Sequence, residues 1–283
     1  MKRRSIFKAA GAAAIAGSAG MVTTTRVNAA RPLNPEVPED LHIIHRKLNF
    51  SMDDRPVFWF IDAVRMGLKD YEFTPFWRMH VGMISRVRDI ADYQYESTLL
   101  MKIFYSDLTT GKLLQTWDNP YTGQTRTVQQ PKLATFTRTH GLTGVIRPTQ
   151  DNSKVREHSR RDVIGPASVV NDDVWCNGDL VEKIGKPNRI DSVIHVNDWS
   201  TFHGSISEVS DPNVASAAAT HTFNDINTFN HPWIGMRGVT ANSVSRGHGR
   251  KSYSIDGMPA PWRRFMAQHH PDVLADIPAA LAG

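Results

Sequence analysis

Residues 105–129 read YSDLTTGKLLQTWDNPYTGQTRTVQ and contain one turn pattern twice. The first copy, DLTTGK at 107–112, returns as NPYTGQ at 119–124. Each copy begins with a side chain that can accept hydrogen bonds from its own turn. Each also has glycine at the fifth position, where a positive φ closes a type I turn with a bulge. Short strand-like segments follow at 112–117 and 125–129, so the stretch predicts three consecutive antiparallel strands in a meander.

Strand-like patterns also dominate the sequence on both sides of these turns. Residues 56–61 (PVFWFI) form an apolar run that is too short for a helix and suits a buried strand. Residues 73–90 predict one or two further strands, and 173–176 and 192–203 predict two more. We therefore expect a mainly β fold, which is either an antiparallel meander barrel, such as a lipocalin or calycin-like barrel, or two packed sheets.

Proline and glycine mark the end of the chain. The sequence PAP at 259–261 opens a short C-terminal helix that runs to about His270, and Pro271 ends it. Gly247 and Gly249 predict a surface loop just before this helix.

The domain organisation follows from two polar or proline-rich stretches. Residues 30–40 carry three prolines and predict an extended linker onto the fold. Residues 149–161 are strongly polar and predict a solvated crossing. We expect one β-rich domain over 41–283, which divides into two β halves at about 41–148 and 162–283.

The first 29 residues predict an export signal. Arg3 and Arg4 are followed by a weakly apolar run at 9–22 that is too rich in Gly and Ala for a membrane span. Small residues then predict cleavage after Ala29. This order is typical of a twin-arginine signal peptide. We therefore expect the twin-arginine translocase as a partner during export, a periplasmic or secreted location, and no stable membrane anchor.

The formal charge of +5 does not indicate a nucleic-acid partner. Residues 1–29 hold five of the 33 basic residues and no Asp or Glu, which leaves 33 − 5 = 28 basic against 28 acidic residues. The mature chain is formally neutral, and we expect no nucleic-acid binding.

The single cysteine, Cys176, excludes an intramolecular disulfide framework, and its place in a predicted strand indicates a packed thiol.

The paired turns with their flanks, YSDLTTGKLLQTW at 105–117 and NPYTG at 119–123, resemble the core of the bacterial domain-of-unknown-function 1838 family. The C-terminal part resembles the same family, from WIGM at 233–236 through GRK at 249–251 to WRRFM at 262–266. The resemblance covers nearly the whole mature chain. It implies a predominantly β fold, and members of the family frequently carry twin-arginine signals. It implies no particular activity and no catalytic residues.

The segment HVNDWSTFH at 195–203 is the strongest candidate for a site, because side chains alternate between the two faces of a strand. One face would carry His195, Asn197, Trp199, Thr201 and His203. Two imidazoles beside an aromatic ring suit acid–base work on a bound small molecule, with His195 and His203 as the catalytic pair. Asn197, Trp199 and Thr201 would contact the ligand. The competing interpretation is an exposed strand face that only meets water.

No reaction is named by a motif. The 12 histidines lack the spacing of a metal site, so we expect no metal, and no cofactor is indicated. Our leading hypothesis is an exported protein that accommodates a small apolar or aromatic ligand in a β-fold cavity. One alternative is a cofactor-independent lyase, isomerase or hydratase that uses histidine acid–base chemistry. Another is a periplasmic interaction protein without a catalytic site.

Overall fold

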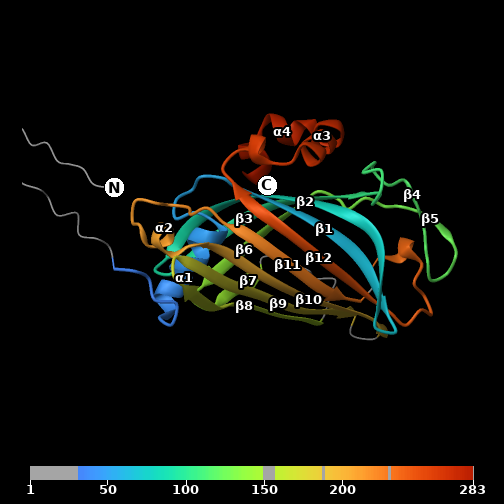
Figure 1. The fold of residues 1–283 in the computed structure, drawn as a ribbon, viewed down its shortest axis with the longest axis horizontal. Coiled ribbons are helices and arrows are strands. Elements are labelled where there is room, and N and C mark those ends of the chain that lie inside the picture. The colour runs from blue at the N-terminus through green and yellow to red at the C-terminus, as the bar shows by residue number, and fades with distance from the viewer. Residues whose placement is uncertain (1–30, 149–156, 187–188, 229–230, 283) are drawn as a thin grey trace, which may run out of the picture. The chain divides into compact units, whose positions relative to one another are not determined.

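A ten-stranded antiparallel sheet, curved into a nearly closed barrel, forms the body of the protein in the computed structural model (Figure 1). The structure describes residues 31–148, 157–186, 189–228 and 231–282. In order across the sheet, the strands are β7 (Gly144–Pro148), β6 (Ala134–Gly141), β3 (Gln94–Ser106), β2 (Glu72–Ala91), β1 (Val57–Lys69), β12 (Asn242–Ser252), β11 (Thr220–Asn227), β10 (Arg189–Ser205), β9 (Asp173–Lys186) and β8 (Glu157–Val170). The predicted mainly β fold is confirmed in its barrel form.

The two predicted halves of the chain each supply five neighbouring strands to this one sheet. β1 and β12 join the halves on one side. On the other side β7 and β8 are the outermost strands, and the backbone N–H of Ile164 donates to the carbonyl oxygen of Thr143 at 3.2 Å across this seam. β8 begins at Glu157, so the predicted polar crossing is shorter than expected, and its residues 149–156 lie outside the described residues. The two halves therefore share one barrel.

Helix α1 (Pro38–Asn49) packs against β8 and β10 at one end of the barrel (Figure 1). The helix buries Ile44 and Leu48 completely, in a core cluster that includes Trp59 and Phe202. The helix begins at Pro38, within the last three residues of the stretch 30–40 that the sequence predicts as a linker. Proline is tolerated at Pro38 because the first turn of a helix leaves its N–H groups unpaired in any case.

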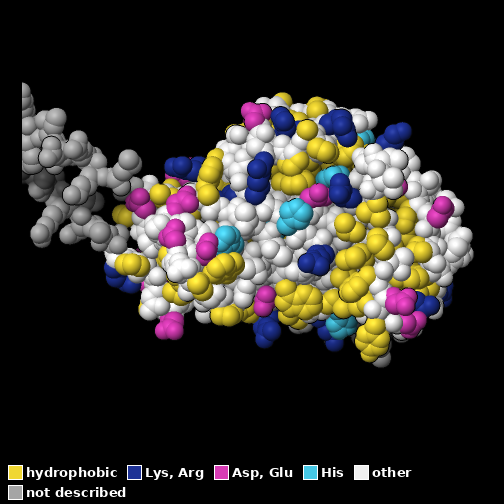
Figure 2. Space-filling view, viewed as in Figure 1, with side chains coloured by type: hydrophobic (Ala, Val, Ile, Leu, Met, Phe, Trp, Pro, Cys, Tyr) yellow, Lys and Arg dark blue, Asp and Glu magenta, His cyan; other side chains and the backbone are white. Residues whose placement is uncertain are grey.

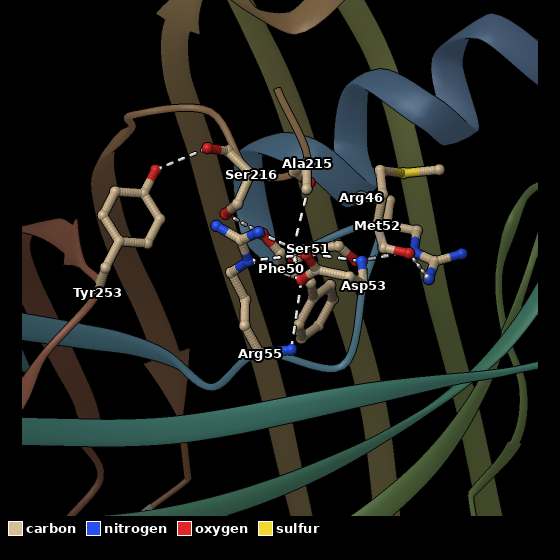
Figure 3. Close-up of polar contacts among 9 residues, drawn as sticks. All are labelled: Arg46, Phe50, Ser51, Met52, Asp53, Arg55, Ala215, Ser216 and Tyr253. Carbon is tan, nitrogen blue, oxygen red and sulfur yellow. Dashed lines mark hydrogen bonds and ion pairs between the residues drawn. The ribbon is translucent and has the colours of Figure 1, made fainter. Parts of the chain in front are cut away.

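The segment after α1 is tied to the barrel by backbone and side-chain hydrogen bonds (Figure 3). The Arg46 guanidinium donates to the carbonyl oxygens of Ser51 at 2.9 Å and Met52 at 3.1 Å. The Ser216 hydroxyl donates to the carbonyl oxygen of Phe50 at 2.6 Å, and the Tyr253 hydroxyl donates to that of Ser216 at 2.8 Å. These bonds link the residues after the C-terminal end of α1 to the loop before β11 and to the end of β12. They hold α1 in position at this end of the barrel.

The two repeated turns form as predicted, but the strands after them do not extend the meander. Gly111 and Gly123 both have positive φ, of 64° and 66°. β4 (Thr116–Asp118) and β5 (Thr125–Thr127) instead pair with each other in a separate two-stranded sheet. The physical reason is that β3 already pairs with β2 along its length and with β6 over Tyr95–Met101, so the segment that follows the first turn meets β3 only in an isolated bridge between Ser106 and Leu113.

The C-terminal helix is confirmed and is followed by two shorter ones. α3 (Ala260–His269), α4 (Pro271–Ala275) and α5 (Ile277–Ala282) pack on the outside of the barrel, and α3 and α5 contact β2 (Figure 1). Trp262 of α3 is fully buried, and its indole N–H donates to the carbonyl oxygen of Lys102 at 3.1 Å. Among the described residues, every helix falls short of the length and hydropathy that a membrane crossing requires.

Replacing Gly82 with alanine is expected to lower the free energy of unfolding by about 1–3 kcal/mol, which urea denaturation measures. A Cβ atom at this position in β2 would lie closer than 3.0 Å to three atoms of the rigid Trp262 indole, so α3 would have to move outward. Gly178→Ala is the control, because its Cβ would meet its nearest neighbour, Phe202, at an ordinary 3.5 Å. Equal stabilities of the two variants would contradict close packing of α3 on β2.

Candidate functional site

The barrel contains a cavity of about 410 Å³. Its apolar lining comprises Phe50, Trp59, Ile61, Met79, Val81, Met83, Leu99, Met101, Ile103, Phe136, Ile164, Leu180, Val196, Phe202 and Phe223. The volume lies within the range of small-molecule sites, roughly 300–1,000 Å³. Eight or more strands enclose an interior of this size when some inward positions are small, as Gly178 and Ser200 are here.

A larger hollow of about 730 Å³ lies on the outside of the barrel, between the segment 53–58 and the C-terminal residues Ile277 and Pro278. Its charged members are Asp53, Asp54 and Arg55, of which Asp53 and Arg55 pair with each other at 2.6 Å. Because this hollow is an open surface feature, the interior cavity is the stronger candidate site.

Helix α1 supplies part of the cavity wall through His45 and Asn49, and Phe50, the residue after the helix, adds to it. His45 meets the edge of Phe202 at 5.9 Å between ring centroids. On its other side, Phe202 stacks in parallel on His221 of β11 at 4.6 Å. The two imidazoles therefore belong to one aromatic cluster at the α1 end of the barrel.

Three ring nitrogens of these two histidines are buried without a hydrogen-bond partner among the described residues: Nδ1 of His45, and both Nδ1 and Nε2 of His221. Burial lowers the pKa of His45 to about 3 and that of His221 to about 4. Both imidazoles are therefore neutral at neutral pH, and each can offer one donor and one acceptor. A buried polar atom without a partner costs free energy, so these atoms are suited to a ligand that pairs with them.

A second polar group in the cavity is the ion pair between Arg65 of β1 and Asp225 of β11. Arg65 Nη1 lies 3.3 Å from the Asp225 carboxylate and donates to the Ser243 hydroxyl at 2.6 Å. The Asp225 side chain is only 3 % exposed. Burial raises the pKa of Asp225, and the Arg65 guanidinium opposes that rise.

The strand register places this pair in a polar row across the barrel wall. Ser245 of β12 lies opposite both Arg65 and Asp225, and Asp198 of β10 lies opposite Asp225. Asp162 of β8 extends the same row, beyond the intervening Leu180 of β9. The charged residues of the cavity are thus contributed by strands far apart in the sequence, and the barrel alone brings them together.

The predicted site residues of β10 face away from the cavity, which reverses the orientation expected from the sequence. Val196, Asp198, Ser200 and Phe202 line the cavity. The alternate residues His195, Asn197, Trp199, Thr201 and His203 lie on the outer face, where Trp199 is 46 % exposed. The outer face that Figure 2 shows carries histidine and hydrophobic side chains among charged ones. The physical reason is that inward positions must fill and line the barrel, and Phe202 does so by packing against α1 and Trp59.

His203 nevertheless makes specific contacts on that outer face. Its Nε2 lies 2.8 Å from the Asp173 carboxylate, and its ring stacks on Trp175 at 5.1 Å. His195 is exposed, and its backbone N–H donates to the Thr228 hydroxyl. The two predicted histidines are thus held in different places, eight residues apart along one strand, and each has its own partners on the outer face.

The described residues contain no group of three His, Cys, Asp or Glu side chains that is placed to hold a metal ion. Cys176 is a fully buried free thiol on the inward face of β9, and burial raises its pKa to about 12. It is therefore the packed thiol that the sequence predicts.

No family model, no curated protein and no solved structure matches this chain. The resemblance to the domain-of-unknown-function 1838 family therefore stays a prediction from the sequence.

Proposed function

We propose that this protein is an exported binding protein that holds a small, largely apolar or aromatic molecule inside its β-barrel. The observation that carries the proposal is the interior cavity of about 410 Å³, in which about half of the lining residues are Trp, Met, Phe or branched aliphatic residues. A well-packed interior has few voids larger than a water molecule, so a space of this size needs a function. Apolar walls with a few convergent polar groups are typical of small-molecule sites.

The two alternatives have less support. Acid–base catalysis by His195 or His203 inside the cavity would require that histidine to face the bound molecule, and both lie on the outer face of β10. An interaction protein without a ligand would leave the cavity and the unpaired imidazole nitrogens of His45 and His221 without a role.

The export part of the proposal rests on the sequence. Arg3, Arg4 and Ala29 lie outside the described residues. Passage through the twin-arginine translocase and a periplasmic or secreted location are therefore proposed from the signal pattern alone.

Filling the cavity is expected to abolish most of the ligand binding. Ser200→Phe places a ring in the cavity from the inward face of β10, and we expect the affinity for N-phenyl-1-naphthylamine to fall at least about tenfold. The fluorescence of this probe rises when it leaves water, so a titration measures its dissociation constant. Native mass spectrometry of the protein from its host would show a retained natural ligand.

Val181→Phe is the matched control. Val181 lies on β9, next to the lining residue Leu180, but it is 39 % exposed and faces outward. This variant should bind the probe as the unmodified protein does. If Ser200→Phe, folded to the same melting temperature, also binds the probe with unchanged affinity, the cavity is not the binding site.

A further inference from the structure

The charges in the cavity wall constrain which molecules it can accept. The described lining residues include two cations, Arg65 and Arg138, and three carboxylates, Asp162, Asp198 and Asp225. A site for a fatty acid or another organic anion would need an excess of positive charge where the ligand carboxylate binds. Among the described lining residues there is no such excess, because the aspartates outnumber the arginines and Arg65 is already paired with Asp225.

The aromatic and methionine side chains of the cavity wall limit which apolar shapes the ligand can have. Trp59, Phe202 and Phe223 present aromatic rings from three strands. Met79, Met83 and Met101 face them from β2 and β3. Methionine adapts to irregular shapes and contacts aromatic rings favourably, and aromatic pairs prefer stacked or edge arrangements. The wall therefore suits flat, ring-containing molecules.

His221 indicates where the polar group of such a molecule binds. Its side chain is 5 % exposed, it lines the cavity, and neither ring nitrogen has a hydrogen-bond partner among the described residues. The ring is held in place by the parallel stack on Phe202 and by the edge contact with Trp59 at 5.6 Å. A hydroxyl group both donates and accepts, so it can pair with the neutral imidazole in either tautomer.

We propose that the ligand is an uncharged aromatic or polycyclic molecule that carries a hydroxyl group, and that the hydroxyl binds His221 while the carboxylates of the wall exclude organic anions. This inference rests on the proposed function, because it names the chemical class of the molecule that the barrel binds. It assigns the specificity to two separate features, the charge of the wall and the unpaired imidazole, which can be tested independently.

The charge of the ligand is tested with two probes that share one skeleton. N-phenyl-1-naphthylamine is neutral, and 8-anilino-1-naphthalenesulfonate adds a single sulfonate to it. We expect the purified protein to bind the neutral probe at least about tenfold more tightly, because like charges across an interface disfavour binding. Loss of the signal in Ser200→Phe, but not in Val181→Phe, establishes that each probe reports on the cavity.

The hydrogen bond is tested by displacement of N-phenyl-1-naphthylamine with 1-naphthol and with naphthalene. We expect 1-naphthol to bind about tenfold more tightly than naphthalene, as one hydrogen bond to an unpaired buried group predicts. His221→Phe keeps a flat ring for the stack on Phe202 and should abolish this preference without weakening naphthalene. The affinity of the unmodified protein for 1-naphthol relative to naphthalene tests the hydrogen bond even if the His221→Phe variant does not fold.

The outcomes separate the inference from the proposed function. If neither probe binds in the cavity, the proposed function fails. If the sulfonate binds there as tightly as the neutral probe, or if naphthalene equals 1-naphthol, the protein remains a binding protein but the inferred ligand class is overturned.

Discussion

Acidification from pH 6.5 to pH 4 is expected to lower the free energy of unfolding by about 6 kcal/mol, about 3 kcal/mol from each of His45 and His221. Burial lowers the pKa of His45 to about 3 and that of His221 to about 4, against an ordinary value of 6.5. Between these values the unfolded chain binds protons that the folded protein does not. Stability therefore falls as the pH falls through this window, and since domains are stable by only about 5–15 kcal/mol, the barrel should unfold in mild acid.

Urea denaturation at pH 7, 6, 5 and 4 measures this dependence. The two histidines together predict an average slope of about 2 kcal/mol per pH unit between pH 6 and pH 4. Burial also lowers the pKa of His42 and His80, which adds to the slope, whereas the raised pKa of Asp225 opposes it. Comparison with variants isolates the contribution of a single imidazole.

His221→Phe is expected to remove about 1 kcal/mol per pH unit from the slope, because phenylalanine does not titrate. Val181→Phe, on the outer face, should keep the full slope. The low pKa of Asp53, held at about 2 chiefly by its hydrogen bond from Arg55, affects stability only below its ordinary value of 3.8, outside this window. A free energy of unfolding that is flat between pH 6.5 and pH 4 would show that neither imidazole is buried in the neutral form.

Arg65→Met is expected to lower the free energy of unfolding by about 3–5 kcal/mol, because it leaves the Asp225 carboxylate buried without its cation. Methionine retains most of the apolar stem of arginine, so the loss reports mainly on charge. Removal of the guanidinium should raise the pKa of Asp225 further. A carboxyl group with a raised pKa binds its proton more readily in the folded state, so the variant should lose more stability at pH 8 than at pH 5.

The double variant Arg65→Met/Asp225→Leu should recover most of this loss, because it removes the uncompensated carboxylate as well. Arg78→Met provides the control for an exposed pair. Arg78 lies 3.4 Å from Asp62, but the side chains are 44 % and 30 % exposed, and such pairs contribute at most about 1 kcal/mol. An effect of Arg65→Met no larger than that of Arg78→Met would mean that the interior pair is solvated.

Local patterns predicted much of the fold, because many of its strands and turns are built by interactions between near neighbours. The apolar run at 56–61 lies in β1 from Val57 onward, and the residues 192–203 lie in β10. The turn glycines Gly111 and Gly123 have the positive φ that their position demanded. In each case the backbone conformation depends on residues within one turn or one strand.

The turn between β1 and β2 and the strand β12 were not predicted, because glycine is absent from the turn and present in the strand. Asp70 and Tyr71 form the tight turn between β1 and β2 with φ of 51° and 66°, although neither is glycine. Gly247 and Gly249 do not form a loop as expected but lie within β12, between β1 and β11. A Cβ at Gly249 would approach the carbonyl oxygen of Phe60 closer than 3.0 Å, so close contact with β1, not a bend, explains this glycine.

The cavity residues show how far a single strand can be interpreted. On β1, Trp59, Ile61 and Arg65 lie on the face that lines the cavity. A charged residue on this apolar face of a strand is a sequence pattern that could have indicated a polar group in the interior. Its partner Asp225 lies 160 positions away in the sequence. No local pattern indicates that partner, because β12 must first lie between the two strands.

The sequence by itself determined that the chain is mainly β, where its glycine turns close, and that the side chains of 195–203 alternate between two faces. These properties follow from the backbone and from near neighbours. Only the tertiary structure decided which face of β10 lines the cavity, because that choice depends on closure of the barrel and on α1 packing against Phe202. It also decided that His45, His221, Arg65 and Asp225 share one interior, since strands and a helix from across the chain build it together.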